Sequence, residues 1–164
     1  MKFDPFGRFA RPSHEDVERK MIVFEIAEMR CGLDIMAVKE IINPGPLVSM
    51  PTAVEYFIGT TDHRSSLVPV VDLRRRLCLP PSESQRAKWV IALVAGKDTA
   101  FVVDAVKGVF SFCKSDLRER HPLMQGSDIS WVKSVYGGAA GLTFELDLDA
   151  MLDAAAPRSA EMRP

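Results

Sequence analysis

Residues 66–74 read Ser-Leu-Val-Pro-Val-Val-Asp-Leu-Arg, and this stretch is decisive for the fold class. Short runs rich in Val, Ile and Phe, bounded by Gly, Pro, Asp or Ser, are typical of β-strands. Ten such runs occur, at 21–26, 30–35, 38–42, 55–61, 66–71, 88–95, 99–106, 107–112, 130–137 and 140–146. So many short strands in 164 residues predict an all-β fold built from small barrels.

A polar segment marked by two prolines, Leu79-Pro80-Pro81-Ser82-Glu83-Ser84, divides these runs into two groups of about five. The pattern predicts two barrels with a common hydrophobic core, one spanning about 21–79 and the other about 85–146. A C-terminal helix is expected at about 147–155, and short helices at 51–55, 72–77 and 115–120. Residues 1–20 and 156–164 have the composition of flexible tails.

Composition excludes several classes of protein. A formal net charge of −1 disfavours a nucleic-acid binder, which needs a basic surface to neutralise phosphates. Three cysteines without a Cys-x-x-Cys pair predict free thiols, and the three histidines have no metal-ligand spacing. With no signal peptide and no membrane-spanning run, we expect a cytoplasmic protein with no metal or cofactor and no membrane insertion.

Catalytic residues are equally hard to find. A small hydrolase would use His63 with Ser65 or Ser66, but neighbours on a strand point to opposite faces, and a polar hairpin turn explains the segment better. The run Arg74-Arg75-Arg76 is the sole support for an alternative function, an SH3-like barrel that binds nucleic acid or another protein. Three basic residues after a strand are more often a solvated face, so we expect a non-enzymatic interaction module.

The segment Gly59–Arg74 resembles the CheW family of chemotaxis coupling proteins, in which Asn-Leu-Arg-Gly precedes Val/Leu-Pro-Val-Val-Asp-Leu-Arg. The similarity continues through the opening hairpin at 24–35, the strand Val38–Ile42 and the segment Phe101–Val109, which contains Val-Val-Asp-x-Val. It covers roughly residues 21–152.

The resemblance implies two five-stranded SH3-like barrels around a common core, with no catalytic activity. It implies an adaptor that couples the cytoplasmic tip of chemoreceptors to the regulatory domain of a CheA-type histidine kinase. The adaptor is expected at receptor arrays, where self-association of copies is an open alternative. Receptor contacts carried over from the family pattern are Val38, Glu40, Ile41, Arg64 and Val106. No kinase-binding residue is assigned. The receptor hairpin would enter an apolar groove between the barrels.

The sequence departs from this pattern at Asp62-His63-Arg64-Ser65, where the family has Asn-Leu-Arg-Gly. The family glycine indicates a left-handed turn, in which Ser65 would cost about 1 kcal/mol unless the turn has changed type. His63 also removes an apolar contact. A divergent paralogue, serving other receptors or a pilus or developmental pathway, fits these changes.

Overall fold

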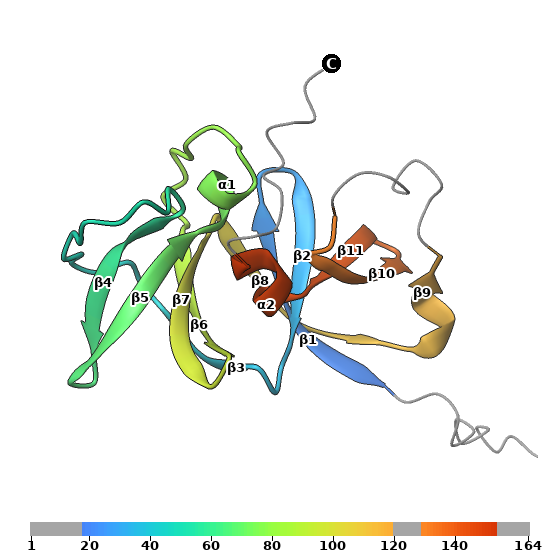
Figure 1. The fold of residues 1–164 in the computed structure, drawn as a ribbon. Helices are drawn as coiled ribbons and strands as arrows, with labels where there is room; N and C mark the ends of the chain where they lie inside the picture. Colours follow the sequence, from blue (N-terminus) through green and yellow to red (C-terminus); the bar gives the residue numbers. More distant parts are fainter. Residues whose placement is uncertain (1–17, 120–128, 154–164) are drawn as a thin grey trace, which may run out of the picture.

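The computed structural model describes residues 18–119 and 129–153, and within these ranges it contains two antiparallel-rich β-sheets (Figure 1). The six-stranded sheet has the order β8-β1-β2-β11-β10-β9. The five-stranded sheet has the order β3-β6-β7-β5-β4. The first sheet comprises β1 (Arg19–Ile26), β2 (Met29–Asp34), β8 (Ala105–Phe112), β9 (Leu117–Arg118), β10 (Val132–Gly138) and β11 (Gly141–Leu146). The second comprises β3 (Val38–Ile42), β4 (Phe57–His63), β5 (Ser66–Asp72), β6 (Lys88–Val94) and β7 (Lys97–Val103).

The two sheets are interleaved along the chain. Strands β1 and β2 belong to the first sheet. The chain then builds the whole second sheet with β3 to β7, and β8 to β11 complete the first. The predicted division into a barrel at 21–79 and another at 85–146 is therefore wrong. The polar segment 79–84 looks like a domain boundary, but it connects two parts of the same sheet. Prolines in a polar segment indicate a loop, but they do not show which strands pair, because pairing between strands far apart in sequence leaves no local pattern.

Alternate residues of the buried strands face different hydrophobic clusters. In β1, Ile22, Phe24 and Ile26 enter a cluster common to both sheets, whereas Met21 and Val23 enter one inside the first sheet. In β6, Val90 and Ala92 join the common cluster, whereas Trp89 and Ile91 lie inside the second sheet. Burial on both faces explains the unbroken apolar runs of these strands. The predicted all-β fold with a shared hydrophobic core is confirmed.

The helices are short. Helix α1 (Leu73–Arg76) begins after Asp72, whose side chain accepts hydrogen bonds from the backbone N–H groups of Arg74 and Arg75. Helix α2 (Leu148–Leu152) begins in the same way after Asp147. Both lie where helices were expected, although the predicted end of α2 at residues 154–155 lies outside the described residues.

Two other helix predictions need correction. Residues 51–55 are not helical: they begin with Pro51, shortly after Pro44 and Pro46, and form an irregular connection with a bend and the start of a turn before β4. Residues 115–120 were expected to form a helix capped by Ser115, but a 3-10 turn covers only Lys114–Asp116 and gives way at once to β9.

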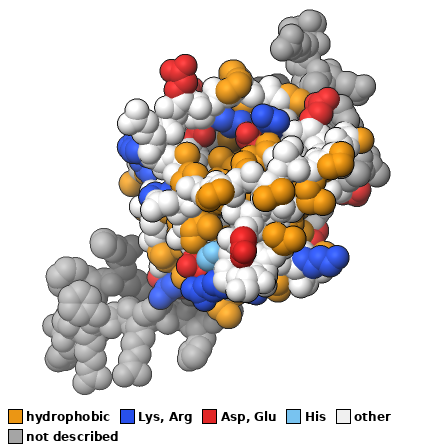
Figure 2. All heavy atoms as spheres, turned by 90° about the vertical axis from the view of Figure 1, so that its left-hand side faces the viewer, with side chains coloured by type: hydrophobic (Ala, Val, Ile, Leu, Met, Phe, Trp, Pro, Cys, Tyr) orange, Lys and Arg blue, Asp and Glu red, His pale blue; other side chains and the backbone are white. Residues whose placement is uncertain are grey.

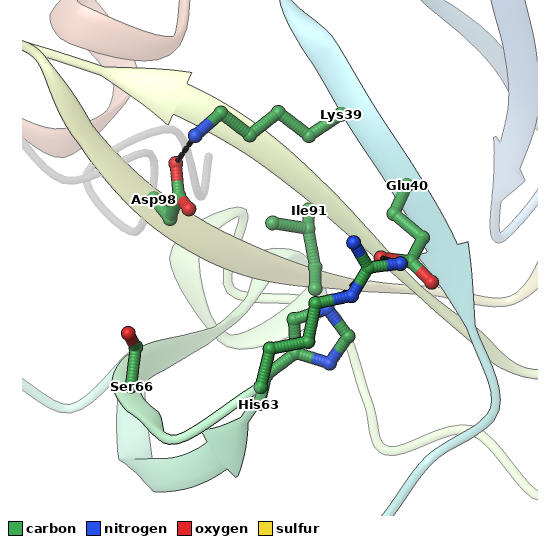
Figure 3. Close-up of a pocket in the computed structure, with 7 residues that line it drawn as sticks. Lys39, Glu40, His63, Ser66, Ile91 and Asp98 are labelled. Atoms are coloured by element: carbon green, nitrogen blue, oxygen red, sulfur yellow. Dashed lines mark hydrogen bonds and ion pairs between the residues drawn. The ribbon is translucent and has the colours of Figure 1, made fainter.

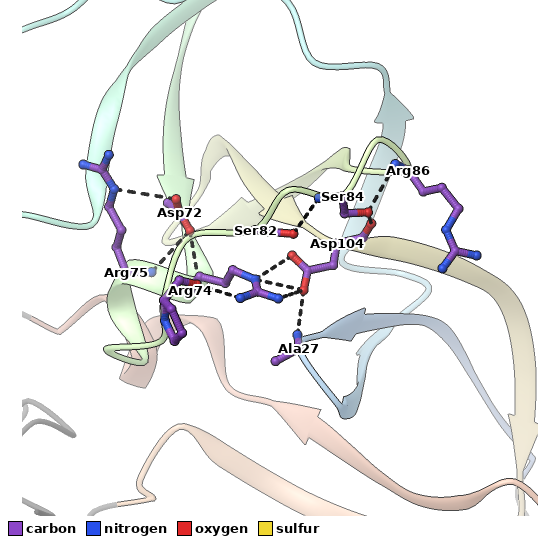
Figure 4. A network of polar contacts seen from close by, with 9 residues as sticks. Ala27, Asp72, Arg74, Arg75, Ser82, Ser84, Arg86 and Asp104 are labelled. Atoms are coloured by element: carbon purple, nitrogen blue, oxygen red, sulfur yellow. Dashed lines mark hydrogen bonds and ion pairs between the residues drawn. The ribbon is translucent and has the colours of Figure 1, made fainter.

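The two motifs that carry the family resemblance meet in space. Arg74, from Val-Pro-Val-Val-Asp-Leu-Arg, directs Nε and Nη2 at the carboxylate of Asp104, from Val-Val-Asp, at 2.7–2.9 Å (Figure 4). Asp104 also accepts a hydrogen bond of 2.6 Å from the backbone N–H of Ala27 in the β1–β2 turn. Since Asp104 stands between β7 and β8, where the chain changes sheets, this network, which we call the Arg74 clip, joins both sheets.

Hydrogen bonding and charge in the clip act on its ionisation. Burial alone would raise the pKa of Asp104, but the hydrogen bonds from Arg74 and Ala27, together with the guanidinium charge, outweigh burial and lower that pKa below its usual value. The hydrogen bond to Asp104 likewise raises the pKa of Arg74. The clip is therefore charged at neutral pH.

Candidate functional site

A cleft lies between β3 and the turn that joins β4 to β5 (Figure 3). Glu40 reaches into it from β3, and its Oε2 lies 2.9 Å from Nε2 of His63 and 3.1 Å from Nη2 of Arg64. On the other side of the cleft, Nζ of Lys39 lies 2.6 Å from Oδ1 of Asp98, an ion pair without hydrogen-bond geometry. We call this arrangement the β3–β4 cleft.

A β-bulge allows two neighbouring residues of β3 to line the same cleft. Val38 pairs with Ala92 and Glu40 with Ile91, so the register shifts at Lys39. On a regular strand, successive side chains point to opposite faces, but a bulge redirects one of them. Figure 3 shows Lys39 turned toward Asp98 and Glu40 turned toward His63, with Ile91 between the two pairs.

The turn between β4 and β5 presents Arg64 at the rim of the cleft. His63 pairs with Ser66, leaving a two-residue loop in which Arg64 and Ser65 have φ values of 52° and 62°. Positive φ at both central positions is the requirement of a type I′ turn. The left-handed turn indicated by the family glycine is therefore kept, although serine occupies its place.

The five residues expected to contact a receptor fall into separate groups. Glu40 and Arg64 are brought together as an ion pair. Val38, on the second sheet, and Val106, on the first, are half-buried and pack against the same shared core. Ile41 is exposed, so of the two apolar residues proposed in β3 it is the one that faces outward.

Sequence reasoning missed two side-chain pairs of the cleft, His63 with Glu40 and Lys39 with Asp98. It considered His63 as a hydrolase histidine and as the loss of a leucine but not as a partner of Glu40, and it did not single out Lys39 or Asp98. The exchange of leucine for histidine was the available signal, because a partly buried imidazole hydrogen-bonds to a polar partner, and a carboxylate is one such partner. The pairing of Lys39 with Asp98 depends on the β-bulge, and no residue pattern in the sequence marks that bulge.

The arginine run is neither a solvated face nor a basic patch. Arg74 belongs to the clip, and the buried Arg76 lies over the ring of Tyr56, 5.6 Å from its centroid, with Nε donating to the backbone oxygen of Met151. Only Arg75, of the three, is exposed. The nucleic-acid alternative is therefore not favoured, since two of the three arginines that supported it make contacts within the protein.

The hydrolase alternative also lacks geometry. The ring of His63 is directed at Glu40, and in residues 18–119 and 129–153 it makes no hydrogen bond to Ser65 or Ser66. No group of three His, Cys, Asp or Glu side chains within those residues could hold a metal ion. No helix within the described part of the chain is long and apolar enough to cross a membrane.

A second ionic cluster lies in the first sheet. The side chain of Glu145 is only 2% exposed, and Arg19 Nη2 approaches its Oε1 at 3.0 Å. Arg19 also binds Asp34, and this hydrogen bond is the largest cause of the raised pKa of Arg19. Tyr136 lies 3.4 Å from Glu145 Oε2 through its hydroxyl. Arg19 thus neutralises a carboxylate that water scarcely reaches.

A segment with exposed apolar side chains lies alongside β4. The segment 43–51, which we call the apolar strap, forms a two-way bridge in which Val48 and Thr60 exchange backbone hydrogen bonds of 2.8 and 2.9 Å. The strap carries three exposed apolar side chains, Leu47, Val48 and Met50. Figure 2 shows hydrophobic side chains gathered on the face that contains β4. Because these apolar side chains lie close together in one segment, the strap is a candidate contact surface.

Comparison with known proteins agrees with this architecture. The model of the CheW-like domain matches residues 20–156. The chemotaxis protein CheW of Rhizobium meliloti is 25% identical over 134 residues, which cover 81% of this chain and 86% of that protein. The Bacillus subtilis CheW is 25% identical over 143 residues, which cover 86% and 91% of the two chains.

A solved structure supports the fold. The scaffolding protein TtCheW from Thermoanaerobacter tengcongensis superposes with a TM-score of 0.77 at 22% identity, over 87% of this chain and 97% of that one. The two expected SH3-like barrels are confirmed, although one sheet has six strands because the two-residue β9 joins it. The expected non-enzymatic coupling function is confirmed at the level of the family. The chain therefore belongs to the CheW-like family, whose members are non-enzymatic scaffold proteins of chemotaxis signalling.

Proposed function

We propose that this chain couples the cytoplasmic hairpin of a chemoreceptor to the regulatory domain of a CheA-type histidine kinase at receptor arrays. The observation that carries the proposal is the meeting of Glu40 and Arg64, which lie 24 positions apart in sequence and form an ion pair at 3.1 Å. Both residues match the receptor-contact pattern of the family. A coupling protein needs two surfaces, and the fold offers two.

The first surface is the rim of the β3–β4 cleft, which receives the receptor hairpin. Arg64 supplies a charge at the edge of the cleft, and Ile41, the next residue of β3 after Glu40, supplies an exposed apolar contact outside it. Val38, from the second sheet, and Val106, from the first, pack against the shared core and help to hold the two sheets together. The cleft itself is lined mainly by charged and polar side chains, so an amphipathic helix would place its polar face there and its apolar face against Ile41.

The second surface is the apolar strap, which contacts the kinase regulatory domain. Its side chains are exposed while its backbone is tied to β4 through Val48 and Thr60. A surface that is already ordered loses little conformational freedom on binding, which favours affinity. The strap therefore suits a stable contact within a signalling assembly.

The test separates the two surfaces. Affinities for a soluble receptor hairpin and for an isolated kinase regulatory domain are measured with four variants: Arg64→Glu, Ile41→Asp, Val48→Lys and the control Leu142→Lys. Leu142 is as exposed as the strap residues but lies on the other sheet. We expect the first two variants to weaken receptor binding at least roughly tenfold, and Val48→Lys to weaken kinase binding by a similar factor.

Each half of the proposal can fail alone. Unchanged receptor binding in both Arg64→Glu and Ile41→Asp would overturn the receptor surface. Equal kinase binding by Val48→Lys and Leu142→Lys would overturn the strap. Folding of all four variants is checked by thermal unfolding, and because these side chains are exposed or at a rim, little loss of stability is expected.

A further inference from the structure

His63 shares one carboxylate oxygen with Arg64. Its Nε2 lies 2.9 Å from Oε2 of Glu40, and Nη2 of Arg64 lies 3.1 Å from the same atom. Because a carboxylate accepts hydrogen bonds and does not donate them, the proton of the neutral ring is on Nε2. The side chain of His63 is 20% exposed and that of Arg64 is 78% exposed, so the histidine lies inside and the arginine faces solvent.

The charge of this group of three depends on the ring of His63. With a neutral ring, Glu40 and Arg64 cancel each other. With a protonated ring, the group carries one positive charge, and Glu40 must balance two cations. The remaining charged groups that face the cleft are Lys39 and Asp98, which pair with each other and contribute no net charge. Histidine is the side chain that ordinarily changes charge between pH 5 and 8.

We propose that His63 is a positioning residue that controls how freely Arg64 engages an acidic side chain on the receptor hairpin. A protonated ring draws the Glu40 carboxylate inward and weakens its hold on the guanidinium. Arg64 has five N–H donors, so it can bind a carboxylate of the partner once Glu40 is drawn away. Receptor binding should therefore strengthen as pH falls. This inference rests on the receptor surface proposed above.

The direction in which receptor affinity changes with pH follows from the charges. At higher pH the exposed arginine is balanced by Glu40, and the cleft attracts an acidic partner weakly. At lower pH the additional positive charge lies beside Arg64, at the rim of the cleft. One charge acting through a partly solvated site over several ångströms changes affinity by roughly threefold to fivefold.

The experiment measures binding of a soluble receptor hairpin at pH 6.0, 7.0 and 8.0, with wild type, His63→Leu and His63→Gln. Leucine restores the family residue and removes the contact. Glutamine keeps a donor for Glu40 but cannot change charge. We expect wild-type affinity to rise by the factor above from pH 8.0 to 6.0, and both variants to show a smaller dependence that reflects only the hairpin.

A second measurement follows the protein alone by NMR. The resonances of the His63 ring and of the Arg64 side-chain Nε–H should move over the same pH range in wild type. In His63→Gln the Arg64 resonance should remain constant over this range. A merely structural histidine would move neither the Arg64 signal nor the pH profile of binding.

The outcomes distinguish the two proposals. Identical pH profiles for wild type and both His63 variants would overturn the role of His63. If Arg64→Glu still loses receptor binding, the proposed receptor surface would stand. Unchanged binding in Arg64→Glu and Ile41→Asp would instead overturn the receptor surface itself. A variant that does not fold is recognised by its thermal unfolding, and the NMR titration of wild type still decides.

Discussion

Replacing Arg74 with alanine should loosen the junction between the two sheets. The substitution removes a guanidinium that makes a two-pronged contact with Asp104, at 2.7–2.9 Å, and a hydrogen bond to the backbone oxygen of Pro80. Hydrogen bonds to charged groups contribute about 1.5–3 kcal/mol each, and a carboxylate left without its partner adds a desolvation penalty. The two side chains are 18% and 13% exposed, so water recovers part of the loss.

The expected cost is about 2–3 kcal/mol in the free energy of unfolding. For a domain of this size, about 1 kcal/mol corresponds to roughly 2–4 °C, so the melting temperature should fall by about 5–10 °C. Urea unfolding monitored by tryptophan fluorescence measures the free energy, and differential scanning calorimetry measures the melting temperature. Arg75→Ala is the matched control, because that arginine is exposed and makes only a 3.7 Å contact with Asp72.

A result within about 0.5 kcal/mol of both wild type and Arg75→Ala would refute the assigned role of the clip. The variant Asp104→Asn adds a pH test. The folded pKa of Asp104 is lowered, so the stabilisation exists above the unfolded value near about 4 and is lost as pH falls through the folded value. The difference in stability between wild type and Asp104→Asn should therefore be constant at neutral pH and shrink below about pH 4.

Three further predictions concern Ser65, Arg19 and Gly59. Ser65→Gly should stabilise the protein by about 1 kcal/mol in urea unfolding, because residue 65 has a φ of 62°, whereas Ser66→Gly in the adjoining strand should destabilise it. Arg19→Met should cost about 2 kcal/mol, because the buried Glu145 loses its nearest cation and keeps only the 3.9 Å approach of Lys133 and the hydroxyl of Tyr136; the double variant with Glu145→Gln should recover most of that loss in the same assay. Gly59→Ala should lower the melting temperature, because its Cβ would lie 2.6 Å from a backbone oxygen of the strap at a φ of 145°. An unchanged value would show that the strap can shift freely.

Local pattern was sufficient to predict the strands but not their partners. Apolar runs such as 88–95 and 21–26 were recognised because both faces of those strands are buried. The interleaving of the sheets was missed, since the pairing of β1 with β8 joins residues 80 to 93 positions apart and depends on the packing of the whole chain. The proline-rich segment at 79–84 therefore looked like a boundary.

For the candidate site too, the sequence identified individual residues, and the structure was needed to show which of them are in contact. The family pattern identified Glu40 and Arg64, and the structure supplied their contact. The roles of Arg74 and Arg76 were beyond sequence reasoning, because a run of three arginines looks alike whether its members face water or the interior. Only the α1 geometry, with successive side chains pointing in different directions around a short helix, separates Arg75 from its two neighbours.

The order of synthesis gives the interleaved sheets a further consequence. Strands β1 and β2 leave the ribosome first, but their outer neighbours, β8 and β11, follow only after the entire second sheet. During that interval the first hairpin has two open edges, which are templates for pairing with other chains. The second sheet, by contrast, is contiguous in sequence and can form as soon as β7 appears. We therefore expect this sheet to fold early and to bring the two halves of the first sheet together, so that a chain cut near Pro80 would yield neither barrel.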